Sequence, residues 1–253
     1  MNTAVLLLAA GEGTRLGGTM AKAFVVVRGQ PLFDYSLRSI EASGVAGSTV
    51  LVVPEREIGR AGELLAEVGR SSRVDAVVAG GATRQESVRL GLKAIPGNAD
   101  LVICHDAARP LASPQLFRRV VEALRTSTGA NGVVPVIPSM DTVKRIRDGR
   151  VVETIPRGEL GLAQTPQSFK AGALREAHAR ALGEGFQGTD DAMLLEAAGF
   201  VVTTAEGEVS NFKVTSPADL WRAEQILVGR EDRSSMARPH RASGASSHRP
   251  VEA

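Results

Sequence analysis

The sequence predicts an α/β fold in which helices flank a mostly parallel sheet. Short apolar runs rich in valine, leucine and isoleucine alternate along the chain with longer segments whose apolar residues recur every three or four positions, which is typical of strands alternating with helices. The length of 253 residues suits one such domain, and 43% apolar residues supply a sizeable core. Because only 4% of the residues are aromatic, small aliphatic side chains must fill that core.

The expected elements follow one another along the chain. Strands are expected at Thr3–Ala9, Thr49–Val53, Val74–Ala79, Asp100–His105 and Gly132–Ile137, with a later apolar run at Phe200–Thr204. Helices are expected at Leu32–Ala42, Glu55–Val68, Arg84–Ile95, Pro114–Thr126, Ala171–Leu182, Asp190–Ala198 and Pro217–Val228.

Residues 141–155 break this alternation. Two polar–apolar segments there surround Asp148-Gly149, a dipeptide typical of a tight hairpin turn. A hairpin has no obvious place in a doubly wound sheet, so it predicts either a surface flap or an arm that packs on another subunit. We therefore expect one domain over residues 1–229, with residues 141–157 forming a projecting β-hairpin arm for dimerisation.

The last 24 residues, 230–253, differ from the rest in composition. They are rich in Ser, Arg, Pro, Gly and Ala, and they contain five arginines and three acidic residues. The formal net charge of +2 therefore belongs to this segment, and residues 1–229 are neutral, which argues against a nucleic-acid partner. Such a composition cannot bury enough apolar surface to offset its ordering entropy, so we expect a disordered tail.

The cysteine content and the apolar runs indicate where the protein acts. A single cysteine, Cys104, excludes a disulfide framework and favours a reducing, cytoplasmic setting. The first apolar run ends at Gly11 and has no basic segment before it, so it does not read as a signal peptide. No run approaches the length of about 18 apolar residues that a membrane span needs, and we expect no membrane partner.

The first strand leads into a glycine-rich loop, Ala9-Ala-Gly-Glu-Gly-Thr-Arg-Leu-Gly-Gly18. Glycines let backbone N–H groups approach a phosphate closely, and Arg15 with Lys22 adds two cations suited to a triphosphate. The loop lacks the Gly-Lys-Ser/Thr ending of a P-loop, and Leu16 stands where the dinucleotide fingerprint needs Gly or Ala. A plain tight turn remains the alternative.

Two more segments follow expected strands. Gly80-Gly-Ala-Thr-Arg-Gln-Glu-Ser87 could let a base or ribose lie against the backbone, and Thr83 with Glu86 also reads as a helix capping box. His105-Asp-Ala-Ala-Arg-Pro110 lies at the carboxyl end of its strand, where ligands bind in open α/β sheets. Asp106 could hold Mg²⁺ or a ribose hydroxyl and Arg109 a phosphate, or the two could form an ion pair. We expect His105 to have a structural role and not a catalytic one.

Seven motifs in this order resemble those of the 2-C-methyl-D-erythritol 4-phosphate cytidylyltransferases, enzymes of isoprenoid-precursor synthesis. The resemblance covers roughly residues 3–228. The motifs are the loop from Ala9 to Arg15, the segment Gly80–Val88, His105-Asp-Ala-Ala-Arg-Pro110, Asp141-Thr142, Gln164-Thr-Pro-Gln167, Thr189-Asp190 and Asn211-Phe-Lys-Val-Thr215. The resemblance implies a Rossmann-like sheet of the nucleotidyltransferase (glycosyltransferase-A-like) type.

The resemblance also implies roles for individual residues. CTP, the co-substrate, would be bound by Ala9, Ala10, Gly11, Gly13, Gly80, Gly81, Arg84, Ser87, Asp106 and Ala107. The sugar phosphate would contact Asp106, Arg109, Thr142, Arg157, Thr165, Thr189 and Lys213. The catalytic residues would be Arg15, Lys22, Arg157 and Lys213, with Asp106 near Mg²⁺ or another divalent cation. The arm would reach across a homodimer, so that Thr142 and Arg157 serve the partner's site.

One segment departs from the family pattern, and three other functions stay open. Family members usually show Pro-Lys-Gln before Phe or Tyr, whereas this chain has Ala21-Lys-Ala-Phe24, which allows a more mobile loop and a slower enzyme. The alternatives are a cytidylyltransferase for ribitol 5-phosphate or another alditol phosphate, a catalytically silent nucleotide-binding module, and an NAD-dependent oxidoreductase. The last needs an acidic residue about 20 positions past the glycines, and Asp34, near that spacing, lies in a helical pattern.

Overall fold

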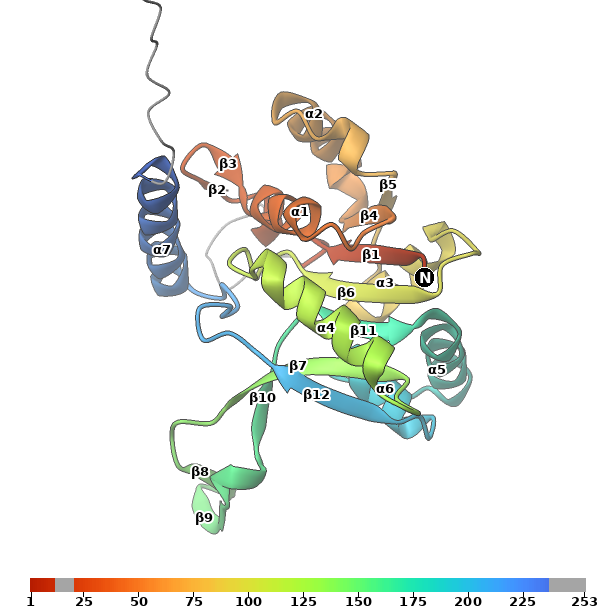
Figure 1. The fold of residues 1–253 in the computed structure, drawn as a ribbon. Coiled ribbons are helices and arrows are strands. Elements are labelled where there is room, and N and C mark those ends of the chain that lie inside the picture. Colours follow the sequence, from red (N-terminus) through yellow and green to blue (C-terminus); the bar gives the residue numbers. More distant parts are fainter. Residues whose placement is uncertain (12–20, 237–253) are drawn as a thin grey trace, which may run out of the picture.

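A mixed, mostly parallel sheet of eight strands forms the centre of the molecule (Figure 1). The computed structural model describes residues 1–11 and 21–236. The strands are β1 (Thr3–Leu8), β4 (Ser48–Val53), β5 (Ala76–Ala79), β6 (Leu101–Asp106), β7 (Gly132–Pro138), β10 (Gly161–Ala163), β11 (Gln167–Lys170) and β12 (Val202–Glu206). Their order is β10-β7-β11-β6-β1-β4-β5, and β12 also pairs with β7, in parallel.

Direction within the sheet changes at β11. Strand β1 pairs in parallel with β4 and β6, and β4 pairs in parallel with β5. Strand β11 runs antiparallel to both of its neighbours, β6 and β7, and β10 runs antiparallel to β7. The prediction of a mostly parallel sheet is confirmed, whereas β10 and β11 were not expected from the sequence.

Helices cover both faces of the sheet. The chain forms α1 (Leu32–Ser43), α2 (Ile58–Glu67), α3 (Arg84–Ala94), α4 (Pro114–Thr126), α5 (Ala171–Glu184), α6 (Asp191–Ala197) and α7 (Pro217–Met236). Alternation along β1 divides the core: Val5 and Leu7 pack with α1, α2 and α4, while Leu6 and Leu8 pack with α3, α5 and α6. This three-layer arrangement explains why the strands are buried on both faces.

The hairpin consists of β8 (Val143–Arg147) and β9 (Arg150–Ile155), and it projects away from the sheet (Figure 1). Asp148 and Gly149 at its tip both have positive φ, as a tight hairpin turn requires. Ile146 and Val151 are 64% and 61% exposed in the single chain. The predicted hairpin is confirmed, and its apolar residues lack a core of their own.

The C-terminal helix extends further than the sequence pattern indicated. Helix α7 continues past the expected boundary at residue 229, as far as Met236. Ala223 and Leu227 pack against Leu32 and Leu111, and Nη2 of Arg230 donates a hydrogen bond to the Leu111 carbonyl at 3.0 Å. The start of the expected tail is therefore part of the folded body. Within residues 1–11 and 21–236, no helix combines the length and hydropathy of a membrane span.

Short elements complete the described chain. Strands β2 (Val26–Val27) and β3 (Gln30–Pro31) form a small ribbon before α1. Four single 3₁₀ turns are described, at Lys22–Phe24, Glu55–Glu57, Ser71–Arg73 and Arg157–Glu159. The first of these turns carries Lys22 into the site described next.

Candidate active site

A pocket of about 350 Å³ opens where β1, β5 and β6 end. Loops that follow the carboxyl ends of parallel strands converge at one edge of the sheet, which is where α/β folds bind ligands. The lining residues are Leu8, Ala9, Ala10, Gly11, Lys22, Ala23, Gly81, Ala82, Thr83, Arg84, Ser87, Asp106, Ala108 and Lys213. Three segments far apart in the sequence, together with Lys213, thus form one site.

The loop after β1 forms the first wall. The Ala9 N–H donates to the Val52 carbonyl at 2.7 Å, which continues the ladder between β1 and β4 beyond the last strand residue. The Lys22 N–H donates to the Gly11 carbonyl at 3.3 Å, so the chain returns to the pocket on the far side of residues 12–20. Lys22 is buried, and Phe24 in the same turn packs edge-on against Phe33. Arg15 and Gly13, both predicted for this wall, lie outside the described residues.

The loop between β5 and α3 forms the second wall, and glycine is required in it. A Cβ atom on Gly80 would lie 2.5 Å from the Ala10 Cβ and 2.8 Å from the Ser87 Oγ. The Ser87 hydroxyl accepts a hydrogen bond from the Gly81 N–H and donates one to the Thr83 carbonyl. The loop after β5 is therefore packed directly against the loop after β1.

The expected capping role of Thr83 is confirmed. Its hydroxyl accepts from the Glu86 N–H at 3.1 Å at the start of α3. The Glu86 carboxylate accepts from the Ala82 N–H, one residue before the cap. These contacts fix the turn that carries Arg84 into the pocket.

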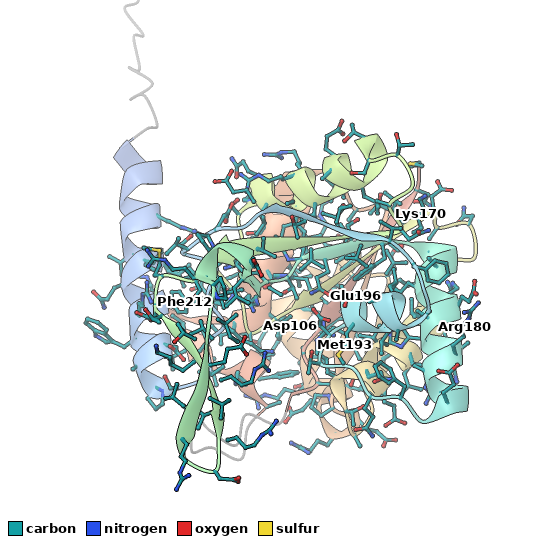
Figure 2. The ribbon with its side chains drawn as sticks, turned by 90° about the horizontal axis from the view of Figure 1, so that it is seen from below. Asp106, Lys170, Arg180, Met193, Glu196 and Phe212 are labelled. Atoms are coloured by element: carbon teal, nitrogen blue, oxygen red, sulfur yellow. The ribbon has the colours of Figure 1, made fainter. Side chains whose placement is uncertain are left out.

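Asp106 carries the negative charge at the end of β6 (Figure 2). Its Oδ1 accepts from Nε of Arg84 at 3.0 Å, and its Oδ2 pairs with Nζ of Lys213 at 2.6 Å. Burial alone would raise the pKa of the Asp106 carboxyl, but the two cations outweigh burial and hold that pKa well below its usual range. Asp106 is thus ionised at neutral pH.

Arg109 is directed to backbone carbonyls. Its Nη1 donates to the Asn211 carbonyl at 2.8 Å and its Nη2 to the Ala163 carbonyl at 3.3 Å. Burial is the largest influence on Arg109, and it lowers the pKa of the guanidinium. Among the described residues, the salt bridges of Asp106 are with Arg84 and Lys213, so the ion pair considered between Asp106 and Arg109 is not formed.

His105 and Thr165 lie behind the pocket. The Thr165 hydroxyl accepts from the Asp106 N–H at 3.0 Å and lies 3.1 Å from Nδ1 of His105. Burial lowers the pKa of His105 to about 3, so its ring is neutral at physiological pH. The ring packs edge-on against Phe117. Thr165 is buried and does not line the pocket; its hydroxyl instead orients the backbone of Asp106.

The segment that carries Lys213 is held by buried amides. The Asn211 side chain donates to the Thr165 carbonyl at 2.8 Å and to Oε1 of Gln164 at 3.2 Å. The Gln164 amide in turn donates to the Glu208 carbonyl. Two of the sequence motifs therefore act together to position one lysine.

Several predicted residues lie elsewhere in the single chain. Thr142 and Arg157 are exposed on the arm, and Thr189 is exposed before α6. Ala107 is buried in the core and does not line the pocket, and Gly80 lines a second hollow that shares Gly81 with the pocket. Leu8, Ala23, Ala82 and Ala108 line the pocket and were not predicted as ligand-binding residues, because small and apolar side chains carry no chemical signal. Thr83 also lines the pocket and was predicted only as a helix cap.

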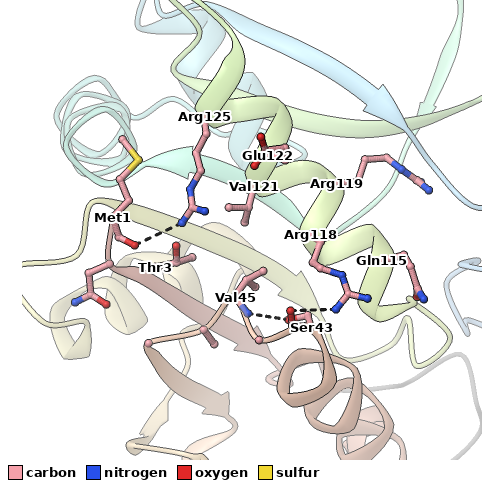
Figure 3. A pocket seen from close by; sticks show the side chains of 14 residues that line it. Met1, Thr3, Ser43, Val45, Gln115, Arg118, Arg119, Val121, Glu122 and Arg125 are labelled. Atoms are coloured by element: carbon pink, nitrogen blue, oxygen red, sulfur yellow. Dashed lines mark hydrogen bonds between the residues drawn. The ribbon is translucent and has the colours of Figure 1, made fainter.

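A larger hollow of about 840 Å³ lies at the opposite, amino ends of β1 and β4 (Figure 3). Arg118 there donates to the Ala42 and Ser43 carbonyls at the end of α1, and Arg125 donates to the Met1 carbonyl. These guanidinium groups join the N-terminus, α1 and α4, and none of the predicted site residues lines this hollow.

Comparison with known proteins identifies the family of the chain. Residues 3–229 match the family model described as IspD, 2-C-methyl-D-erythritol 4-phosphate cytidylyltransferase. The chain belongs to this family. As a member of the IspD family it is a cytidylyltransferase that joins CTP to 2-C-methyl-D-erythritol 4-phosphate in the non-mevalonate isoprenoid pathway.

Individual relatives agree with the family match. The chain is 39% identical over 233 residues to a 2-C-methyl-D-erythritol 4-phosphate cytidylyltransferase of Halalkalibacterium halodurans. The matched region covers 92% of this chain and 100% of that protein. It is 46% identical to the bifunctional enzyme IspD/IspF of Nitratidesulfovibrio vulgaris over 87% of this chain and 57% of that longer protein.

Solved structures of the IspD family share the fold. The enzyme of Thermus thermophilus is 35% identical, with a TM-score of 0.74, over 90% of this chain and 100% of that chain. The synthase of Anaerococcus prevotii is 28% identical, with a TM-score of 0.76, over 90% of this chain and 98% of that chain. These likenesses confirm the predicted α/β architecture of the nucleotidyltransferase.

Proposed function

We propose that the pocket at the ends of β1, β5 and β6 is where CTP and 2-C-methyl-D-erythritol 4-phosphate react to give 4-diphosphocytidyl-2-C-methyl-D-erythritol and pyrophosphate. The observation that carries this assignment is the convergence of two glycine-bearing loops with Lys22, Arg84, Asp106 and Lys213 in one pocket. A glycine loop suits phosphates, and a second loop closed against it suits a base and ribose.

The reaction needs positioning and charge stabilisation. A phosphate oxygen of the sugar attacks the α-phosphorus of CTP, a P–O bond forms, and the bond from the α-phosphorus to the bridging oxygen breaks as pyrophosphate leaves. The nucleophile is already ionised at neutral pH, so no general base is required. The work of the protein is to bring together two anions that repel each other and to stabilise the spread of charge.

Each segment has a share in that work. Lys22 and Arg15 stabilise charge at the α-phosphate, next to the backbone of Ala9–Gly11. The loop of Gly80 and Gly81, shaped by Ser87, receives cytosine. Lys213 offers its ammonium to the sugar phosphate and is held in place by Asp106, 2.6 Å away.

A magnesium ion fits this pocket through Asp106. Among the described residues, no group of three or more His, Cys, Asp or Glu side chains gathers to hold a metal. Mg²⁺ commonly binds through one or two carboxylates and takes its other ligands from substrate phosphates and water. Asp106 lines the pocket and is ionised, so it is a suitable ligand. When bound with CTP, the ion would supply further neutralisation of phosphate charge.

A second copy of the chain completes the site. Met140, Ile146, Val151, Val152 and Leu162, on the arm and beside it, are each at least half exposed in the single chain. Pairing two arms about a two-fold axis would bury these residues, and such isologous contacts are the commonest route to a dimer. Thr142 and Arg157 would then contact the sugar phosphate in the partner's pocket. The enzyme acts in the cytoplasm, in keeping with its single buried cysteine.

Pyrophosphate release tests this function directly. Purified protein is mixed with Mg²⁺, one nucleoside triphosphate and one polyol phosphate, and the initial rate of pyrophosphate release is measured. We expect CTP with 2-C-methyl-D-erythritol 4-phosphate to be the fastest pair, and ribitol 5-phosphate and glycerol 3-phosphate to be slower by a factor of about 100. A faster rate with ribitol 5-phosphate, or no release with any pair, contradicts the proposal.

A further inference from the structure

A line of buried polar contacts runs from the pocket into the protein through Arg84. The Nε of Arg84 donates to Asp106 Oδ1 at 3.0 Å, and its Nη1 donates to Asp191 Oδ2 at 2.8 Å. The other oxygen of Asp191 lies 3.0 Å from Nε2 of His178. One guanidinium therefore joins a carboxylate that lines the pocket to a carboxylate that does not.

Asp191 is a costly residue to bury. It is 0% exposed at the start of α6, and His178 on α5 is 2% exposed. Burial alone would raise the pKa of the Asp191 carboxyl, but Arg84 and His178 outweigh burial and lower it, so Asp191 is charged. An apolar side chain of similar volume often stabilises a fold as well as a buried ion pair does. A role beyond packing would account for a charge at this position.

Capping of α6 does not require Asp191. The neighbouring Asp190 accepts from the Met193 N–H at 3.0 Å and is the N-cap. Asp190 also accepts from the Gln167 amide at 2.8 Å, and its carboxylate has no hydrogen bond to Arg84 among the contacts described. Two adjacent aspartates on one helix thus have separate partners, and only Asp191 is connected to the pocket.

We propose that Asp191, supported by His178, is a positioning residue of the reaction, which holds Arg84 so that only one edge of its guanidinium meets Asp106. Without Asp191, Arg84 can pair with both oxygens of Asp106, the geometry that arginine prefers with carboxylates. Oδ2, which now binds Lys213, would then be shared between two cations. The lysine would lose its fixed place beside the sugar phosphate. This inference rests on the proposed function of the pocket.

The first measurement compares two matched variants, Asp191→Asn and Asp190→Asn. Each replaces one carboxylate by an amide of the same size on the same helix. Initial rates are measured at saturating CTP and at a temperature well below both melting points. We expect kcat/KM for 2-C-methyl-D-erythritol 4-phosphate to fall by about 10-fold to 100-fold in Asp191→Asn, because small displacements at a reacting site are costly. In Asp190→Asn the amide keeps one oxygen as a cap but cannot also accept from Gln167, so we expect a lower melting temperature and kcat/KM within about twofold of the unmodified chain.

The second measurement separates positioning from general damage. Asp191→Asn is combined with Arg84→Met, which already lacks the guanidinium. If Asp191 acts through Arg84, its replacement lowers kcat/KM much less in this background than alone, so the two losses are not additive. Equal losses in both backgrounds, or kcat/KM within threefold of the unmodified chain for Asp191→Asn alone, overturn the proposal.

A third measurement does not depend on activity. Exchange with solvent of the Arg84 Nη–H protons, one of which Asp191 accepts, is followed by NMR on protein labelled with ¹⁵N in the arginine guanidinium. We expect faster exchange in Asp191→Asn and unchanged exchange in Asp190→Asn. Should Asp191→Asn not fold, Asp191→Glu keeps the charge and moves it by one methylene; unchanged exchange together with unchanged kcat/KM in that variant overturns the proposal. An unmodified chain that releases no pyrophosphate contradicts the function alone, and the exchange rates still decide the positioning.

Discussion

Lys22, Arg84 and Lys213 bring positive charge to a pocket in which Asp106 is ionised. Arg84 and Lys213 are engaged by Asp106, which limits their freedom before any substrate binds. In many enzymes, hydrogen-bond donors already held where charge develops make the largest single contribution to stabilising the transition state. At the scale of single residues, the site is therefore organised around one carboxylate.

Replacing Lys22 or Arg15 by alanine is expected to slow the reaction strongly. Each loses a cation beside the phosphate-binding backbone, so kcat should fall by a factor of about 100 to 1,000. Pyrophosphate release and the melting temperature are measured on the same samples. Turnover equal to that of the unmodified chain in either variant would remove that residue from the catalytic set, and an unchanged melting temperature shows that the fold is intact.

His105 is expected to make the protein less stable as the pH falls. Its pKa is about 3 in the folded state because of burial, whereas an unfolded histidine has a pKa of about 6.5. Between these values the unfolded chain binds the extra proton. The stabilisation is therefore complete above pH 6.5 and decreases by about 1.4 kcal/mol per pH unit below it.

Urea unfolding of the unmodified chain and of His105→Asn at pH 7.5, 6.5, 5.5 and 4.5 measures this effect. We expect the free energy of unfolding to fall about 2 kcal/mol further in the unmodified chain between pH 6.5 and 4.5. The range stops above the ordinary carboxyl pKa, because Asp106 and Asp191, with lowered pKa values, add their own losses only below it. Parallel curves for the two proteins would show that His105 is not the group responsible.

At the scale of elements, most residues that line the pocket lie on turns and loops, and the strands fix the positions of those turns. The turn after β5 reaches the pocket only because Gly80 lets it pack on Ala10, and the 3₁₀ turn at Lys22–Phe24 is anchored by Phe24 in the core. The amides of Gln164 and Asn211 fix the segment leading to Lys213. Changes at these turns should alter substrate binding before they unfold the sheet.

Gly80→Ala is expected to raise the KM for CTP by about tenfold or more. The added methyl group would lie 2.5 Å from the Ala10 Cβ, so one of the two pocket walls must move. Gly62→Ala in α2 is the matched control, since a Cβ there meets nothing within 4 Å and alanine favours helix. Steady-state rates over a range of CTP concentrations compare them. An unchanged KM for CTP in Gly80→Ala would show that this turn does not shape the nucleotide site.

Truncation should separate α7 from the residues that follow it. A chain ending at Met236 is expected to keep its melting temperature and activity. A chain ending at Gly229 loses the hydrogen bond from Arg230 to Leu111 and the last turns of α7, and its melting temperature should fall by about 2–4 °C or more. Calorimetry of both truncated chains measures this. Equal melting temperatures would show that the folded domain ends at residue 229, as the composition suggested.

At the scale of the whole molecule, we propose that each site is built from two chains. A single chain leaves Thr142 and Arg157 exposed on the arm, away from the residues that line its pocket. It also leaves apolar side chains of the hairpin exposed to solvent, and exposed apolar patches favour association with another surface. One two-fold contact would resolve both features.

Complementation tests the shared site. Chains with Arg157→Ala and with Lys22→Ala, each nearly inactive alone, are mixed under conditions that exchange subunits. The heterodimer keeps one site with both residues intact, so about a quarter of full activity should return at equal mixing. Mixing Lys22→Ala with Lys213→Ala is the control. Each of these changes damages the pocket of the chain that carries it, so the heterodimer has no intact site. No recovery despite proven exchange, or a monomer by light scattering, rules out the shared site.

The sequence by itself determined what depends on local chemistry. Hydrophobic period placed six of the eight strands of the central sheet and six of the seven described helices within a few residues, because period is a property of a short window; for α7 it placed the start but ended the helix eight residues early. Asp148-Gly149 predicted the hairpin, since its backbone geometry suits few other residues. The order of motifs indicated the family, and strand-end position predicted Asp106 as a site residue.

Only the tertiary structure decided which side chains meet. Strand β11 has a single apolar residue, Phe169, among its four residues and so shows no apolar run, yet it lies antiparallel between β6 and β7. The partners of Arg84 include Asp191, 107 positions away, and no periodicity relates residues at that distance. Whether a buried aspartate is paired, and with which cation, depends on how the helices pack on the sheet. Pairing of this kind is a property of the folded chain, because the free energy that keeps Asp191 charged comes from partners that only folding brings within 3 Å.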